Sequence, residues 1–179
     1  MTKTARRTPR ATLTAVDGVD AAAVLAGARR ALGALPRGGI SAWDASGVFQ
    51  ELAVAGDSAG APSARTLLLL YAADLAFRLR WQIRPALAEG RSVVAAPYVE
   101  TAVAFGRAAG LEPAWLANLF RFALRPNTRQ FVHAPRTRAL AVKDGFVGFS
   151  CGCISIDGGK NARRRLVERT AAELRRRDR

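Results

Sequence analysis

The sequence predicts an α/β protein, a three-layer sandwich in which a mostly parallel sheet is flanked by helices. Two observations support this class. Short apolar segments alternate along the 179 residues with longer segments of helical composition. Half of the residues are hydrophobic and 23% are charged, which is the balance of a globular domain and excludes a largely disordered chain. We therefore expect a single domain over residues 12–179, preceded by a flexible basic tail over residues 1–11.

Four segments have the composition of buried strands. The first ends at the turn signal Asp17-Gly18, and the second is closed by Pro97. The other two are short apolar runs late in the chain. The expected strands are Leu13–Val16, Ser92–Ala96, Gln130–His133 and Gly152–Asp157.

Helices are expected between these strands. Asp20 stands where a capping side chain would begin the first helix, and Pro85 predicts a kink near the end of the longest one. Residues 56–63 are rich in glycine, alanine, serine and proline and predict a loop, whereas residues 134–150 show no clear pattern. The expected helices are Ala21–Leu35, Ser46–Val54, Ser63–Glu89, Tyr98–Ala109, Glu112–Leu124 and Asn161–Arg176.

The net charge of +14 is concentrated at the two ends of the chain. Residues 1–10 hold four basic side chains and no acid, and residues 160–179 hold nine bases against three acids. Basic ends attract polyanions, so a weak contact with nucleic acid is one interpretation. A solvated tail and the polar face of a last helix are the other.

The compartment is expected to be the cytoplasm. The longest uninterrupted apolar run, Leu67–Ala73, is too short to span a bilayer, and Met1–Arg10 does not resemble a secretory signal. Cys151 and Cys153 are one residue apart, a spacing that suits neither a structural disulfide nor a metal site. We expect no membrane contact and no bound metal.

Three phrases in the middle of the chain follow one another in the order and spacing of a known protein family. The segment S-A-R-T-L-L-L-L-Y-A-A-D-L-A from Ser63 resembles S-P-R-x-E-L-L-L-F-A-A-D-R-A. Ile83–Val94 resembles I-x-P-A-L-x-x-G-x-x-V-V, and Ala96–Gly106 resembles D-R-Y-x-D-S-x-x-A-Y-Q-G. These patterns are those of the thymidylate kinase family of P-loop nucleoside monophosphate kinases, which the chain resembles loosely from about residue 12 to residue 175. The resemblance implies a P-loop fold, ATP and Mg²⁺ as ligands, and dimers formed through helices that include the long one.

The phosphate-binding loop of that family is altered in this sequence. The family's F-E-G-x-D-G-x-G-K-(S/T) cradles phosphates with backbone N–H groups, a lysine and a magnesium-binding hydroxyl. Here the run from Val16 reads V-D-G-V-D-A-A-A-V-L, in which Asp17, Gly18 and Asp20 survive. Valine stands at the lysine position and leucine at the hydroxyl position. The degenerate phosphate loop thus comprises Asp17, Gly18, Asp20, Val24 and Leu25.

Other charged positions of the family are replaced as well. Leu75 stands for the arginine of the A-A-D-R phrase, Ala96-Pro97 for the Asp-Arg pair and His133 for the aspartate of L-D-x-P. These losses together remove most of the electrostatic stabilisation that phosphoryl transfer requires. By resemblance, the residues that remain form a vestigial nucleoside pocket. Its members are Arg65, Tyr71, Asp74, Tyr98, Glu100 and Thr101.

The sequence therefore predicts a thymidylate-kinase-like pseudoenzyme with no catalytic residues and no bound cofactor. Its expected role is that of a binding or scaffolding subunit, as a homodimer or as a heterodimer with a kinase-like relative. Two alternatives stay open. One is a nucleotide-binding protein or dTMP-kinase-like enzyme whose phosphate contacts come from a partner chain or from Arg136 and Arg138. The other is a nucleic-acid-associated protein that uses its basic termini.

Three further features favour structural interpretations. The sole histidine, His133, is more typical of a strand end than of a catalytic base. A nucleophilic site pairing it with Cys151 or Cys153 lacks any known signature. Residues 157–161, D-G-G-K-N, could bind an anion before the last helix but lack P-loop spacing, which favours a turn and a helix cap.

Overall fold

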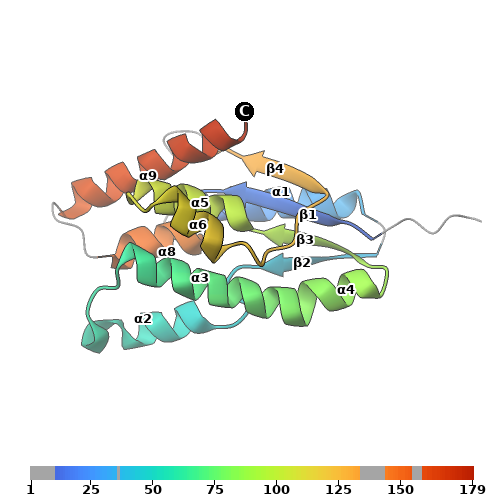
Figure 1. Cartoon of the computed structure of the whole chain (residues 1–179), viewed down its shortest axis with the longest axis horizontal. Coiled ribbons are helices and arrows are strands. Elements are labelled where there is room, and N and C mark those ends of the chain that lie inside the picture. The colour runs from blue at the N-terminus through green and yellow to red at the C-terminus, as the bar shows by residue number, and fades with distance from the viewer. Residues whose placement is uncertain (1–10, 36, 134–143, 155–158) are drawn as a thin grey trace, which may run out of the picture.

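The expected α/β class with a parallel sheet is confirmed. The structure, a computed structural model, describes residues 11–35, 37–133, 144–154 and 159–179 (Figure 1). Within these residues four parallel strands form one sheet in the order β2-β3-β1-β4, and helices flank it as in P-loop kinases. The strands are β1 (Leu13–Gly18), β2 (Gly38–Ala42), β3 (Ser92–Ala96) and β4 (Thr128–Val132).

The helices of the described residues alternate with these strands. None of them combines the length and the apolar character needed to cross a lipid bilayer. Asp20 caps the first helix through its side chain, as expected, and Ser63 caps the third in the same way. The helices are α1 (Ala21–Gly33), α2 (Val48–Ala59), α3 (Ala64–Arg78), η1 (Leu79–Ile83), α4 (Arg84–Ala88), α5 (Val99–Ala108), α6 (Pro113–Leu119), α8 (Gly145–Cys153) and α9 (Gly159–Arg177).

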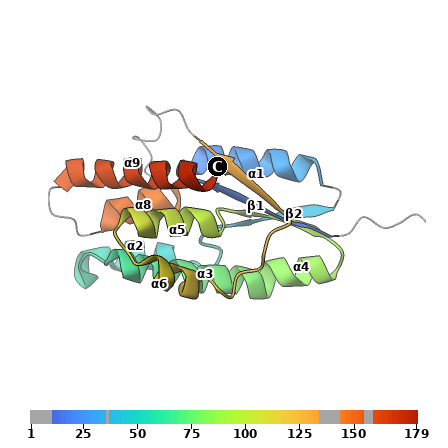
Figure 2. The same ribbon diagram turned by 45° about the horizontal axis from the view of Figure 1, so that its top comes forward.

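The sheet separates two apolar cores, because successive side chains of a strand point to opposite faces. In β1, Leu13 and Ala15 belong to the larger core on the side of α3 and α5, whereas Val16 faces α1. Figure 2 shows α1 on one side of the sheet, with α3 and α4 on the other. Helix α9 packs along α5. The cores fix the carboxyl ends of β1, β2 and β3 side by side.

The long helix expected over Ser63–Glu89 is present as the continuous run α3–η1–α4. Its hydrogen bonding changes at Leu79–Ile83, where a π-helical turn replaces the α-helical pattern. Pro85 follows directly within the first turn of α4, and it cannot donate a backbone hydrogen bond to the preceding turn. A π turn at this point accommodates the proline within the run.

Several boundaries differ from the sequence-based expectation. The strand expected over Gly152–Asp157 is wrong at its start, because residues 152 and 153 end α8; residues 155–157 lie outside the described residues. The loop expected over 56–63 is wrong in its first half, because α2 continues to Ala59. The helix expected over Glu112–Leu124 stops at Leu119. Strand β2 and helix α8 have no counterpart in the expectation, since glycine in β2 and in α8 weakens each signal.

Candidate functional site

The turn between β1 and α1 lies at the carboxyl edge of the sheet, the usual location of ligand sites in open parallel sheets. Only Val19 and Asp20 separate the strand from the helix. An Asp20 carboxylate oxygen accepts a hydrogen bond from Ala23 N at 2.8 Å, and the Asp20 carbonyl accepts one from Val24 N at 2.9 Å. The three alanines at the family's glycine-rich positions are thus the first turn of α1, and the amides of Ala23 and Val24 already have partners.

Val24 and Leu25 continue this helix in different environments. The Val24 side chain is 5% exposed and packs beside Gly18, where an added Cβ would lie 2.8 Å from the valine methyl and 2.6 Å from Val132. Only glycine fits at position 18 without displacing these neighbours. Leu25 is 41% exposed. The expected loop residues therefore lie together, and the side chains that Val24 and Leu25 present at this turn are hydrocarbon.

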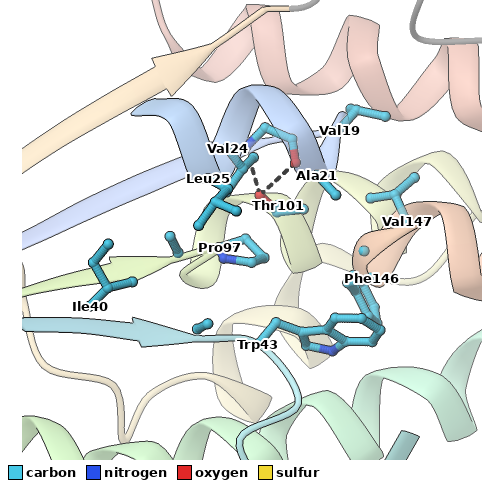
Figure 3. A pocket seen from close by; sticks show the side chains of 14 residues that line it. Val19, Ala21, Val24, Leu25, Ile40, Trp43, Pro97, Thr101, Phe146 and Val147 are labelled. Carbon is cyan, nitrogen blue, oxygen red and sulfur yellow. Dashed lines mark hydrogen bonds between the residues drawn. The ribbon is translucent and has the colours of Figure 1, made fainter. Parts of the chain in front are cut away.

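A pocket of about 230 Å³ opens beside this turn (Figure 3). Leu25 and Ile40 line one side of it, and Phe146 and Val147 from α8 line the other, with Pro97 and Trp43 between them. The remaining lining residues are small or apolar apart from one threonine. They are Gly18, Val19, Ala21, Val24, Ala42, Ala96, Thr101 and Gly145.

Helix α8 closes one end of the pocket through a close approach to α1. Gly145 has a φ of +77°, and an added Cβ there would lie 2.8 Å from the Ala21 Cβ. A larger residue at 145 would both strain the backbone and push α8 away from the turn. Gly145 is thus the point at which α8 is fitted against the first turn of α1.

A buried polar network centres on the Asp17 carboxylate. One oxygen accepts hydrogen bonds from Tyr98 N, Thr101 N and Thr101 Oγ1 at 2.8–2.9 Å. Thr101 Oγ1 in turn accepts a hydrogen bond from Gly18 N at 3.0 Å. Burial raises the pKa of Asp17 to about 6, the three donors oppose that rise, and the charge of Glu100 adds to it. The network ties β1 to the start of α5.

The Tyr71 ring is not available for stacking on a base. Tyr71 is 0% exposed, and its ring packs against Phe146 at 4.5 Å and Phe120 at 6.1 Å between centroids. Its hydroxyl donates to the carbonyl of Tyr98, and burial raises its pKa. Phe146 also contacts Phe105 and belongs to a larger aromatic cluster. Aromatic side chains of the protein therefore cover the face that a nucleobase would need.

Asp74 and Arg78 form a fully buried ion pair with a distance of 2.9 Å between Nε and Oδ2. The Asp74 carboxylate also accepts hydrogen bonds from Ser46 N and Ser46 Oγ. Arg78 Nη1 donates to the carbonyls of Ser41 and Pro97, at the ends of β2 and β3. Asp74 is thus engaged with the protein itself, and Arg78 holds two strand ends together.

Two other residues of the expected nucleoside pocket lie apart from this network. The Arg65 guanidinium lies 5.1 Å from the centroid of the Trp115 ring. Glu100 pairs with Arg129 at 3.5 Å and with Arg177 of α9. The structure therefore brings together Asp17, Tyr71, Asp74, Tyr98 and Thr101, whereas Arg65 and Glu100 contact other partners.

The minor candidates show no catalytic arrangement. His133 Nε2 lies 2.8 Å from an Asp178 carboxylate oxygen in an exposed pair. Burial raises the pKa of the Cys151 thiol to about 12 and also raises that of Cys153, the opposite of what a nucleophilic cysteine requires. No group of three potential metal ligands gathers within the described ranges. Arg136, Arg138 and the start of the 157–161 segment lie outside those ranges.

Three residues that shape the site were missed from the sequence. Trp43 follows the unforeseen strand β2, Phe146 lies on the unforeseen helix α8, and Arg78 lies on α3. The run G-F-V-G-F-S-C-G-C has the apolar composition of a buried element and could have indicated α8. Arg78 offers no such signal, because it is the last residue of α3 and an arginine at the end of a helix is usually solvated.

Comparison with known proteins finds partial relatives of a single kind. A segment of 59 residues, 33% of the chain, is 42% identical to a probable thymidylate kinase of Thermococcus gammatolerans and covers 28% of that protein. A segment of 84 residues, 44% of the chain, is 34% identical to a probable thymidylate kinase of Thermococcus kodakarensis and covers 41% of it. The matches thus span less than half the length of these curated relatives. No family model matches the chain.

These matches support a thymidylate-kinase-like relationship, as the quoted phrases suggest. The α/β fold with its parallel sheet agrees with this relationship.

Proposed function

We propose that this protein is a thymidylate-kinase-like pseudoenzyme that performs no phosphoryl transfer and acts as a binding or scaffolding subunit. The observation that carries the proposal is the first turn of α1. Ala21–Ala23 form helix where the family has a glycine-rich loop, and Val24 replaces the lysine. Without that lysine a triphosphate loses a charge-assisted contact worth about 2–3 kcal/mol or more.

The lining of the pocket supports the same proposal. Among the described residues that line it, none carries a charge, so the charge that develops on a transferring phosphoryl group would have no counterpart. Leu25 replaces the hydroxyl that would bind Mg²⁺, which argues against a bound ATP–Mg²⁺ complex as cofactor. Tyr71 lies under Phe146 and offers no face to thymine.

A dimer interface is proposed on the exposed face of the long helix. Leu69, Phe77 and Trp81 are 52%, 39% and 62% exposed and, with the exposed Ala73, recur every four residues. This spacing gives an apolar stripe along one side of a helix. We propose that a second copy of the chain, or a kinase-like relative, covers it.

The setting we propose for this role is a reducing compartment such as the cytoplasm. Both cysteines are free thiols, Cys151 being buried, and neither forms a disulfide. Such thiols are typical of proteins kept under reducing conditions.

A weaker candidate function is contact with nucleic acid through α9. Arg163, Arg165, Arg169 and Arg175 are exposed on this helix, and no ion pair is seen for them in the described structure. Such a contact predicts DNA affinity that falls steeply with salt concentration and disappears when residues 160–179 are removed.

The deciding experiment is a phosphoryl-transfer assay with γ-labelled ATP, Mg²⁺ and dTMP, together with calorimetry of each nucleotide. The proposal predicts neither transfer nor heat of binding at millimolar nucleotide. Transfer that is lost in a Leu25→Arg variant but kept in a Val54→Arg variant would overturn it. These two exposed aliphatic residues form a matched pair, because Leu25 lies at the pocket and Val54 lies on α2, outside both the pocket and the proposed dimer interface.

A further inference from the structure

The pocket beside α1 is chemically suited to a neutral ligand. Its larger side chains are hydrocarbon or aromatic: Val24, Leu25, Ile40, Trp43, Pro97 and Phe146. The Thr101 hydroxyl, which also lines the pocket, accepts from Gly18 N and donates to Asp17 Oδ1. The proton of the hydroxyl is thus engaged within the protein, and the other polar side-chain atom of the lining, Trp43 Nε1, is a single neutral donor that is buried without a partner in the described structure. A charged group placed there would lose its hydration without compensation.

The walls of the pocket are held by contacts outside it. The Trp43 ring packs against Phe49 at 4.8 Å and against Phe149 at 6.1 Å between centroids. Arg78 fixes the ends of β2 and β3 through the carbonyls of Ser41 and Pro97. Because Phe49 and Arg78 are buried and hold the walls from outside the pocket, the pocket is preformed and does not depend on its occupant.

The size of the pocket sets the size of the ligand. A dry apolar cavity of about 150 Å³ holds one benzene molecule. In proportion, the 230 Å³ beside α1 holds about nine non-hydrogen atoms, the size of a fused two-ring aromatic. The flat faces of Trp43 and Phe146 and the Pro97 ring favour a planar molecule over a branched one.

We propose that this pocket binds a small, neutral, planar apolar molecule, an inference that rests on the proposed loss of phosphate binding. Leu25 and Ile40 contact one edge of the ligand, Phe146 the opposite edge, and Trp43 one face. Binding is driven by the transfer of apolar surface out of water. In this proposal, a pocket at the position where a kinase-like fold binds phosphate binds an apolar molecule instead.

The test compares 1-naphthol with 1-naphthyl phosphate, two probes that share a ring system and differ in charge. The readout is the set of indole N–H signals in a ¹H–¹⁵N spectrum of the full chain, which has three tryptophans. Trp43 lines the pocket, whereas Trp81 is 62% exposed on η1 and Trp115 lies on α6. A Trp43→Phe variant assigns the signal of Trp43.

We expect 1-naphthol to shift the Trp43 signal saturably, with a dissociation constant on the order of 10⁻⁴ M for a ligand of this size. Trp81 and Trp115 signals should stay in place, and 1-naphthyl phosphate should bind at least tenfold more weakly. Leu25→Arg should weaken 1-naphthol at least tenfold, whereas Val54→Arg, at a position 86% exposed on α2, should not. Because Leu25 is 41% exposed, the variant should fold, which its circular dichroism verifies.

Absence of a saturable Trp43 shift, or equal binding of the phosphate ester, overturns the inference. Neither result bears on the phosphoryl-transfer assay, so the two proposals fail separately. A chain that neither transfers phosphate nor binds 1-naphthol remains a pseudoenzyme without this ligand site. A chain that transfers phosphate removes the premise of both.

Discussion

The turn at Asp17–Leu25 and the segment Ser63–Gly106 meet at the same edge of the sheet but differ in the chemistry of their side chains. The second segment contains the phrases that resemble those of thymidylate kinases, and its residues Asp74, Arg78, Tyr98 and Thr101 take part in a buried ion pair and buried hydrogen bonds. In the first, the side chains that point into the pocket are hydrocarbon. The polar residues of the second segment stabilise the fold, whereas the residues of the turn line the pocket in which a ligand would lie.

A physical reason underlies this division. Replacing one partner of the Asp74–Arg78 pair leaves a buried charge uncompensated, so the fold itself resists the change. Val24 and Leu25 face the pocket, where an apolar side chain leaves no buried polar group without a partner. Apolar side chains at the pocket therefore carry little structural cost, whereas a change in the buried ion pair carries a large one.

The largest expected effect is on the buried ion pair. Arg78→Ala should lower the free energy of unfolding by about 3–5 kcal/mol, because it leaves the Asp74 carboxylate buried without its cation. Urea unfolding followed by circular dichroism measures the change. Arg80→Ala, two residues further along the same helical run, is the matched control, since Arg80 is exposed and its guanidinium lies over the Trp81 ring. It should cost less than about 1 kcal/mol. Equal losses in the two variants would contradict the structural role given to Arg78.

The second effect concerns Asp17 and depends on pH. Burial raises its pKa in the folded protein from the ordinary 3.8 to about 6, so the folded state binds the proton more tightly than the unfolded state. Protonation therefore favours folding, and this contribution is present below pH 3.8 and is lost as the pH rises to 6. Over that window the free energy of unfolding should fall by about 3 kcal/mol relative to an Asp17→Asn variant.

Unfolding of both proteins at pH 4, 5, 6 and 7 measures this difference. The Asp17→Asn variant keeps an oxygen that accepts from Tyr98 N and Thr101 N, so the comparison isolates the charge. If the free energies of unfolding of the two proteins changed in parallel with pH, Asp17 would be hydrated, and the hydrogen-bond network would not exclude water from the turn.

The sequence predicted the fold class and most of the elements because their signals are local. Strand Ser92–Ala96 is an apolar run closed by a proline, and the cap at Asp20 is a side chain with a known preference. Strand β2 was missed because G-G-I-S-A has little β propensity and forms through its pairing with β3. These residues form a strand because of their tertiary contacts and not because of their own propensity.

The sequence predicted some residues of the candidate site, but it did not predict the side chains that surround them. Of the expected set, Gly18, Val24 and Leu25 line the pocket, whereas Asp17 and Asp20 are buried and do not line it. That Phe146 would cover Tyr71 could not be read from the sequence, because the two are 75 positions apart and meet only when α8 packs on α3 and α5. A long-range contact of this kind leaves no periodic signal in either segment.

A third prediction concerns position 24, where the resemblance implies a lysine, and its expected effect on stability is smaller. Val24→Lys should lower the free energy of unfolding by about 1–3 kcal/mol, since it puts a polar end in a buried apolar position. ATP–Mg²⁺ should not raise the melting temperature of this variant, because the amides of residues 23 and 24 remain engaged by Asp20. Val24→Met is the control for size without charge. A nucleotide-dependent rise in Val24→Lys alone would show that the turn can still open into an anion cradle.

The smallest expected effect is at Arg65, which resembles a residue of the family's nucleoside site but lies over the Trp115 ring. Arg65→Ala should lower the free energy of unfolding by only about 0.5–1 kcal/mol, the range of an exposed cation–π contact. Lysine retains the charge, so Arg65→Lys should recover part of that loss, whereas Trp115→Leu should cancel the difference between arginine and alanine at position 65. A double-mutant cycle in urea measures this coupling. A coupling energy near zero would contradict the structural role assigned to Arg65. Arg65 would then again be a candidate ligand-binding residue.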